Sequence, residues 1–305
     1  MLTQSNPGFV NLGLMLGKEK LMNYIKEFGF GEKTGIDLNG EGTGILFDLD
    51  AMGNVELATT AFGQGISVTP IQQVRAVSAV VNGGNLYSPY IVRNFLESET
   101  DTIVKSNSPT LIKNVISEET SSIVRYALES VVAKGSGHNA YIENYRIGGK
   151  TGTAQTVENG IYSDSKYILS FIGFLPADDP KIVVYVAVQN AKNVVQYGGT
   201  VAAPIARNIF LSAIDILDIS PDTEGIPKEY TWLDTKYVVV PDTTGVSLEE
   251  AKKMLKGFNI EYSGSGDQVV YQSPSGGMYV KEGGTVILMP VSYTHLRAHE
   301  TRHDL

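Results

Sequence analysis

The chain has 305 residues, a formal net charge of −9 and no cysteine. Its length predicts two folded units, and its 42% hydrophobic content is that of a globular protein. The negative charge argues against a nucleic-acid-binding protein, and the lack of cysteine excludes disulfide scaffolds and thiol catalysis. The longest purely apolar run, Ile182 to Val188, is far shorter than the ~20 residues of a membrane span, and the first residues lack the features of a signal peptide.

Apolar residues at helical spacing predict four helices, over residues 9–28, 71–81, 117–132 and 204–217. The first is interrupted near Gly17. The second is preceded by Pro70 at the first helical position, where the missing N–H is not needed. In the third helix, four apolar residues are expected on the buried face: Ile123, Ala127, Leu128 and Val131.

Three runs rich in β-forming residues lie between the last two helices, over residues 153–157, 168–174 and 182–188. Short turns separate these runs, which predicts successive antiparallel hairpins. Helices before and after an antiparallel sheet predict an α+β fold class for residues 1–218. The segment Ser163–Lys166 falls between the first two runs, and we expect it in a solvated loop.

A second, smaller unit follows a linker that is predicted over residues 219–236 from its proline, glycine and scattered charge. The unit itself, residues 237–290, is expected to hold one helix on a short sheet. A capping box at Ser247–Glu250 begins the helix, and strand-like runs lie at residues 237–240, 258–262, 268–272 and 285–289. Pro290 is expected to end the last strand, and residues 291–305 are expected to be an artefactual or disordered tail.

The strongest candidate for chemistry is the segment Lys150-Thr151-Gly152-Thr153, which opens the predicted sheet. Its ammonium supplies positive potential, its two hydroxyls can hold a substrate carboxylate, and its glycine leaves room for a ligand along the strand. The backbone N–H of Thr153 can point at a developing oxyanion. The alternative is a glycine-rich turn with a surface lysine. A second copy of the triplet, Lys33-Thr34-Gly35, has no strand after it and predicts such a turn.

Two competing motifs do not predict a site. A phosphate-binding loop at Gly149 would need a second glycine where this sequence has Asn144, and no parallel βαβ pattern surrounds it. His299-Glu300-Thr301-Arg302-His303 matches a zinc-protease motif, but a terminal turn cannot enclose a catalytic site. Residues 292–305 resemble translated sequencing-adapter read-through, so we expect neither a metal nor a cofactor.

Five blocks, in order, resemble the transpeptidase domain of class B penicillin-binding proteins, in particular those of cell division and sporulation: Asn6–Val10, Phe28–Ile36, Gly63–Pro70, Gly149–Gln155 and Ser170–Phe174. The unit from Val239 onward is similar to a PASTA domain. The resemblance implies serine acyl transfer, in which an active serine attacks the D-Ala–D-Ala bond of a peptidoglycan stem peptide. The acyl group then passes to a neighbouring amine, and β-lactams acylate the same serine.

The same resemblance implies the partners and the location of the protein. Stem peptides and β-lactams are the expected ligands, and division or sporulation proteins are expected partners. A membrane anchor at the N-terminal side, outside this sequence, would hold the protein at the outer face of the cytoplasmic membrane. No nucleic acid is expected.

The sequence departs from the family pattern at the nucleophile. The family's Ser-x-x-Lys element precedes its Ser-x-Asn element, to which we assign Asn6 and Ser5 although Gln4 stands two residues before Asn6. One Ser-x-x-Lys string exists, Ser163–Lys166, but it follows the Lys150 strand and is not expected to be the nucleophile. We therefore expect a fragment that lacks the nucleophile and is inactive by itself. A non-catalytic wall-binding or scaffold protein is the alternative, and a soluble D,D-carboxypeptidase or β-lactamase is a third hypothesis.

Overall fold

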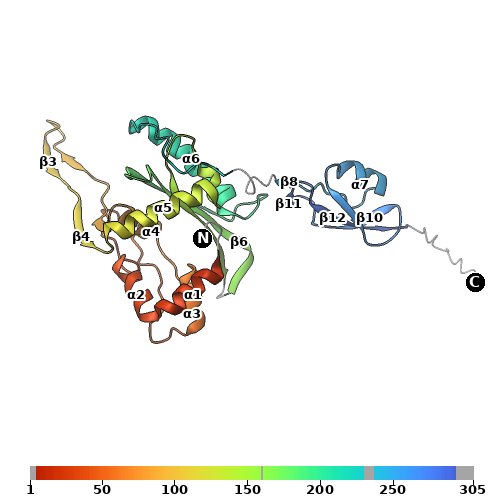
Figure 1. Ribbon diagram of the computed structural model, residues 1–305, viewed down its shortest axis with the longest axis horizontal. Helices are drawn as coiled ribbons and strands as arrows, with labels where there is room; N and C mark the ends of the chain where they lie inside the picture. Colours follow the sequence, from red (N-terminus) through yellow and green to blue (C-terminus); the bar gives the residue numbers. More distant parts are fainter. Residues whose placement is uncertain (1–4, 159–160, 230–236, 293–305) are drawn as a thin grey trace, which may run out of the picture. The chain divides into compact units, whose positions relative to one another are not determined.

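The computed structural model describes residues 5–158, 161–229 and 237–292. These residues form two compact units, of which the first holds the helices and strands up to Ile216 and the second those from Tyr237 onward (Figure 1). Among the residues described, no helix has both the length and the apolar character needed to cross a membrane.

Helices make up much of the first unit: α1 (Asn6–Leu16), α2 (Lys18–Glu27), α3 (Asn54–Ala61), α4 (Pro70–Val81), α5 (Glu118–Lys134), the short 3-10 helix η1 (His138–Ala140) and α6 (Gly198–Ile216). The predicted interruption near Gly17 is confirmed, because Gly17 has a φ of +83° and separates α1 from α2. Pro70 is the first residue of α4, as predicted. The hydroxyl of Thr69 caps this helix by accepting a hydrogen bond from the N–H of Gln72.

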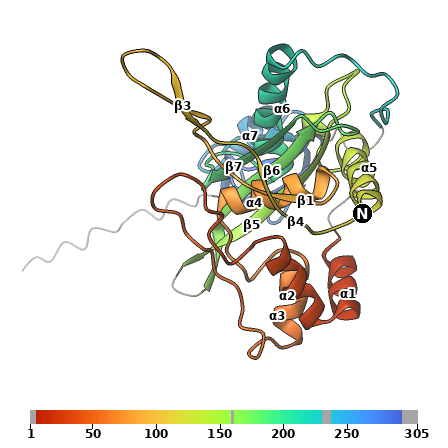
Figure 2. The ribbon, with the colours of Figure 1, turned by 90° about the vertical axis from the view of Figure 1, so that its left-hand side faces the viewer.

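A three-stranded antiparallel sheet joins these helices: β5 (Gly148–Glu158), β6 (Ile161–Leu175) and β7 (Ile182–Gln189). The predicted strand runs lie inside these three strands, and the α+β fold class is confirmed. The order β5-β6-β7 places β5 at an edge. Helices cover both faces (Figure 2). On the face that bears Phe171, α6 and the end of α5 pack together, whereas α4 and Leu128 of α5 pack on the face that bears Phe174.

The loop predicted at Ser163–Lys166 is wrong, because these residues lie inside β6. Pairing between β5 and β6 is interrupted there: Gln155 pairs with Tyr167, and the next pair joins Val157 to Tyr162. The polar residues mark a local bulge in a long strand rather than a connection between two strands.

Two helix predictions also need correction. The helix α6 begins at Gly198, six residues before Pro204, which lies within it. In α5, Val131 is buried as predicted, but Ile123 is 64% exposed and Ala127 is exposed as well. The buried face of α5 instead includes two polar residues with internal partners, Ser121 and Glu129. Apolar spacing alone cannot locate such a face.

Four further strands and α3 were not predicted. The strands form one antiparallel excursion, residues 85–114, which we call the arm: β1 (Asn85–Ser88), β2 (Asn94–Leu96), β3 (Ile103–Ser106) and β4 (Thr110–Asn114). β1 pairs with β4 at its base, and β2 pairs with β3 at its outer end. In Figures 1 and 2 the β2–β3 end stands clear of the rest of the first unit.

Residues 219–229, at the start of the predicted linker, are hydrogen-bonded to the body of the first unit. The N–H of Asp222 donates to the carbonyl of Asn144 (2.8 Å), and the N–H of Ile226 donates to the buried carboxylate of Glu129 (3.1 Å). Residues 230–236, the rest of that stretch, lie outside the described residues.

The second unit packs one helix, α7 (Leu248–Met254), against a small sheet. The other elements are β8 (Tyr237–Val239), β9 (Asn259–Tyr262), β10 (Gln268–Ser273), β11 (Tyr279–Lys281) and β12 (Thr285–Val291). The hydroxyl of Ser247 caps α7 as predicted, accepting from the N–H of Glu250 at 3.3 Å. A compact core links helix and sheet: Val240, Ala251, Leu255, Val269, Val286 and Leu288.

Two details of this unit differ from the predictions. The strand β11 was not predicted. β12 continues through Pro290 to Val291, so Pro290 does not end it. The final segment, residues 293–305, lies outside the described residues, and the expected tail with its His299–His303 motif stays a prediction.

Candidate active site

Lys150 lies near the start of the edge strand β5, on the face of the sheet that α4 covers. Its side chain is half-buried, and its Nζ donates to the carbonyl oxygen of Thr151 at 2.8 Å. It forms no ion pair with any residue that the structure describes, and burial lowers its pKa below the usual value. A cation that has lost water without gaining a counter-ion is stabilised by a bound anion.

The backbone next to Lys150 is open on one side. The carbonyl of Tyr167 in β6 accepts from the N–H of Asn190, so the backbone groups of Tyr167 face β7. Because these groups alternate in an antiparallel sheet, those of Ser170 face β5 and pair with Gly152. Thr153, the next residue along β5, therefore directs its N–H away from β6, toward the open edge. This is the direction that an oxyanion donor requires.

The hydroxyls of the two threonines lie on the opposite face, toward α5 and α6. Thr151 is buried, and its Oγ1 lies 2.9 Å from Oγ of Ser136, in the turn after α5. Oγ1 of Thr153 accepts from the N–H of Gly198 at 3.1 Å, so its own proton remains available for donation.

Two glycines bring the start of α6 against β5. A Cβ atom on Gly198 would collide with the carbonyl oxygen of Gly152. A Cβ atom on Gly199 would collide with the carbonyl oxygen of Ser136. The positive end of the α6 dipole is thereby placed at Thr153, in addition to the charge of Lys150. The edge strand thus has two sources of positive potential.

Ser136, Gly198, Gly199 and Asn139 are the parts of this arrangement that sequence reasoning missed. Asn139 holds the start of α6 in place, because its Nδ2 donates to the carbonyl of Gly199 at 2.9 Å. In the sequence these residues carry only turn signals, a Gly-Ser-Gly after one helix and a Gly-Gly before another. Such signals predict chain reversals and give no indication of which segments meet.

Ser5 and Asn6 lie at the start of α1. Ser5 is the N-cap of α1, and its Oγ accepts from the N–H of Gly8 at 3.3 Å. Asn6 is the first residue of α1, and both side chains are exposed. Neither residue hydrogen-bonds to β5 within the described part of the chain. The structure therefore places Lys150 and the two threonine hydroxyls on opposite faces of one edge strand, and no hydrogen bond joins Ser5 or Asn6 to that strand within the described residues.

The Ser163–Lys166 string does not have the geometry of a nucleophile with its lysine. Its backbone is strand, in which residues three apart are separated by about 10 Å. A helical turn would instead place such a pair on one face. Among the residues described, no group of three or more histidine, aspartate or glutamate side chains lies close enough to hold a metal.

Comparisons with known proteins identify the two units of the chain. Residues 1–211 match the model of the penicillin-binding protein transpeptidase domain, and residues 238–289 match the PASTA domain. Stage V sporulation protein D of Bacillus subtilis is 58% identical over 281 residues, which cover 92% of this chain and 44% of that protein. A probable peptidoglycan D,D-transpeptidase, PenA of Neisseria meningitidis, is 31% identical over 222 residues, covering 72% of this chain and 36% of that protein.

Solved structures show the same fold. Penicillin-binding protein 3 of Mycobacterium tuberculosis, complexed with ampicillin, gives a TM-score of 0.67 at 29% identity, covering 74% of this chain and 53% of that one. The transpeptidase domain of Burkholderia pseudomallei penicillin-binding protein 3 gives a TM-score of 0.63 at 31% identity, covering 71% and 63%. The chain spans less than half the length of the curated relatives cited above. With the transpeptidase match extending over residues 1–211 and a PASTA domain after it, the chain belongs to the class B penicillin-binding proteins.

Proposed function

We propose that the protein of which this chain forms part is a peptidoglycan D,D-transpeptidase, which cross-links stem peptides by serine acyl transfer. The observation that carries the proposal is the half-buried Lys150 without a carboxylate partner among the described residues, on an edge strand with an outward N–H at Thr153. A stem peptide that ends in D-Ala–D-Ala offers both the anion and the extended backbone that this edge fits.

Each residue of the strand has a role in the proposal. Lys150 attracts the terminal carboxylate, and the hydroxyls of Thr151 and Thr153 hold it. Gly152 keeps this point of the strand free of a side chain, since a Cβ atom there would collide with Oγ of Ser170 in β6. The N–H of Thr153 stabilises the tetrahedral oxyanion. Asn6 and Ser5 represent the Ser-x-Asn element, and a serine outside this sequence is the nucleophile.

The remaining assignments follow from the same proposal. β-Lactams acylate the nucleophile as substrate mimics, and the protein works at the outer face of the cytoplasmic membrane together with division or sporulation proteins. The chain divides into a transpeptidase part at residues 1–218, a linker at 219–236 and the PASTA module that follows.

The test uses the whole protein, in which these residues are joined to the sequence that precedes them in the gene. It is incubated with fluorescent penicillin and with a stem pentapeptide plus an amine acceptor. We expect a covalent label and an acyl-transfer product. Lys150→Ala should slow acylation about 100-fold, which is the scale of a lost electrostatic contact in an active site. The matched control is Lys33→Ala, in the other triplet, which should acylate at the unaltered rate.

Two results would overturn the proposal. One is a whole protein that takes no label, and the other is a Lys150→Ala variant that is labelled as fast as Lys33→Ala. The chain of 305 residues alone should take no covalent label. A stable label on Ser163 or Ser5 of that chain would show that the nucleophile is misassigned.

A further inference from the structure

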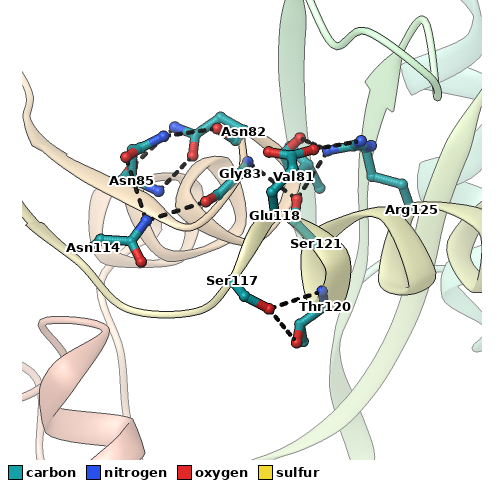
Figure 3. Close-up of polar contacts among 10 residues, drawn as sticks. All are labelled: Val81, Asn82, Gly83, Asn85, Asn114, Ser117, Glu118, Thr120, Ser121 and Arg125. Atoms are coloured by element: carbon teal, nitrogen blue, oxygen red, sulfur yellow. Dashed lines mark hydrogen bonds and ion pairs between the residues drawn. The ribbon is translucent and has the colours of Figure 1, made fainter.

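The helix α5 is anchored to the end of α4 by polar contacts along its first half. Oγ of Ser121 accepts from the N–H of Gly83 at 3.1 Å (Figure 3). Nη1 of Arg125 donates to the same Oγ at 2.9 Å and to the carbonyl of Val81 at 3.0 Å (Figure 3). Nη2 of Arg125 also pairs with Glu118 at 3.0 Å, in the first turn of α5. These contacts fix the position of α5, and with it the start of the turn that follows.

Ser136 lies in that turn, which is held on both of its sides. The N–H of Gly137 donates to the carbonyl of Val131, in the last turn of α5, at 3.1 Å. On the other side, Nδ2 of Asn139 donates to the carbonyl of Gly199 in α6 at 2.9 Å. The carbonyl of Ser136 packs so closely against Gly199 that a Cβ atom on this glycine would collide with it. The backbone of Ser136 is therefore fixed by both helices.

The hydroxyl of Ser136 meets the Lys150 strand at a buried point. Its Oγ lies 2.9 Å from Oγ1 of Thr151, and Thr151 is only 4% exposed. A hydroxyl that is buried to this extent is oriented by the protein groups around it rather than by solvent. The direction of the O–H bond of Thr151 therefore depends on what Ser136 presents to it.

A bound carboxylate would decide which of the two hydroxyls donates. A hydroxyl has one proton to donate and can accept two hydrogen bonds, whereas a carboxylate only accepts. When Thr151 holds the substrate carboxylate, its proton is directed to the ligand, so Ser136 must supply the proton that lies between the two hydroxyls. Both O–H bonds then point the same way, from Ser136 through Thr151 to the carboxylate, and each polarises the next.

We infer that Ser136 is a positioning residue for the carboxylate-binding hydroxyl of Thr151. It donates to Oγ1 of Thr151 and so directs the Thr151 proton toward the ligand, without contacting the ligand itself. A ligand that has no negative charge at this position gains nothing from Ser136. The inference rests on the proposed function, because it concerns how the Lys150 strand recognises the terminal carboxylate of its substrate.

The test measures acylation rates of the whole protein with one fluorescent penicillin in two forms, the free acid and its methyl ester, which lacks the negative charge. Ser136→Ala should slow acylation by the acid about tenfold, which is the scale of one hydrogen bond, and leave the rate with the ester unchanged. The matched control is Ser130→Ala, which removes a hydroxyl that donates to the carbonyl of Tyr126 within α5 (3.0 Å). This control should acylate at the wild-type rate with both forms.

A double variant tests whether Ser136 acts through Thr151. Thr151→Val alone should slow acylation by the acid, and adding Ser136→Ala to it should cause no further slowing, because the hydroxyl that Ser136 orients is already absent. Thermal melts establish that each variant is folded. If Ser136→Ala does not fold, Ser136→Cys takes its place, since a thiol is a weak donor.

Three results would overturn the inference: equal slowing of acid and ester, additive slowing in the double variant, or a Ser136→Ala variant that acylates as fast as Ser130→Ala. The proposed function survives each of these results as long as the wild type is labelled and Lys150→Ala is slow. A wild type that takes no label would overturn the proposed function, and this inference with it.

Discussion

The chain contains the triplet Lys-Thr-Gly twice, and the two copies differ in whether a carboxylate of the protein itself binds to them. At Lys33-Thr34-Gly35 the protein supplies its own carboxylate. Oε1 of Glu41 accepts from the N–H of Thr34 (2.6 Å) and from its buried hydroxyl, and Oε2 accepts from the N–H of Gly35 (3.1 Å). Burial raises the pKa of Glu41, but these hydrogen bonds and the charge of Lys33 outweigh it and hold the pKa below its usual value.

At Lys150-Thr151-Gly152 no described carboxylate takes that place, and the triplet lies on a strand with an open edge. The first copy shows, within one molecule, that these residue types hold a carboxylate through a hydroxyl and backbone N–H groups. Whether the triplet closes a turn or faces a ligand is decided by the secondary structure around it and by a glutamate six residues beyond Gly35. The triplet alone does not determine its role.

The largest expected effect concerns the backbone N–H of Thr153, which faces the open edge of the strand that holds the second triplet. Thr153→Pro removes an N–H that points away from β6, so that the β5–β6 hydrogen bonds survive. In the whole protein we expect acylation by penicillin to slow about 100-fold or more with little loss of melting temperature. Thr153→Val keeps the N–H and should acylate faster than Thr153→Pro. Equal rates for the two variants would show that this N–H is not an oxyanion donor.

The second-largest expected effect concerns the Glu41 carboxylate, which binds the first triplet. Glu41→Gln weakens three hydrogen bonds to a carboxylate that is partly exposed, and we expect the free energy of unfolding to fall by about 1–2 kcal/mol at neutral pH. Urea denaturation measures it, with the exposed Glu99→Gln as the matched control. Acylation of the whole protein should be unchanged. A loss of acylation without a loss of stability would mean that the first triplet is also part of the active site.

The difference in stability between the wild type and Glu41→Gln should depend on pH, which tests whether the lost charge causes it. The pKa of Glu41 is lower in the folded chain, so its carboxylate stabilises the fold at pH values above the unfolded pKa of about 4.3. That contribution is lost as the pH falls through the folded value. Urea midpoints of the wild type and of Glu41→Gln should therefore converge in acid. A constant gap across this range would point to a lost packing contact rather than to a lost charge.

The sequence allowed prediction of those parts that depend on local pattern. Apolar spacing and capping residues located α1, α2 and α4, and the strand after Lys150 distinguished the two triplets. Closure of the first triplet by Glu41 was not predicted, because a glutamate in a loop carries no periodic signal. The arm was also missed, since exposed apolar residues on both faces of β2 and β3 do not alternate with polar ones.

The other incorrect or missing predictions depend on contacts between segments that are far apart in the sequence. The buried face of α5 depends on Arg146, whose guanidinium reaches Glu129 across 17 positions of sequence (Nη2 to Oε2, 2.9 Å). Likewise Ser136 and Gly198 meet β5 only because α5 and α6 pack on the same face of the sheet. Such pairs are selected by the packing of whole elements, and local composition does not reveal them.

The smallest expected effect is a change in stability when the lysine of each triplet is replaced, and it has opposite signs in the two triplets. Burial lowers the pKa of Lys150, so the folded chain holds that proton less tightly than the unfolded chain does. Lys150→Met should therefore raise stability at neutral pH by less than about 1 kcal/mol, and the gain should shrink as the pH rises and vanish above pH ~10.4, where the unfolded lysine has also lost its proton. Lys33→Met should instead lower stability slightly, because the charge of Lys33 favours the Glu41 carboxylate. Thermal melts of the wild type and both variants, at neutral pH and above pH ~10.4, measure these differences. If both variants lose stability at neutral pH, Lys150 already has an anionic partner in the folded chain, and the contrast between an open and a closed triplet does not hold.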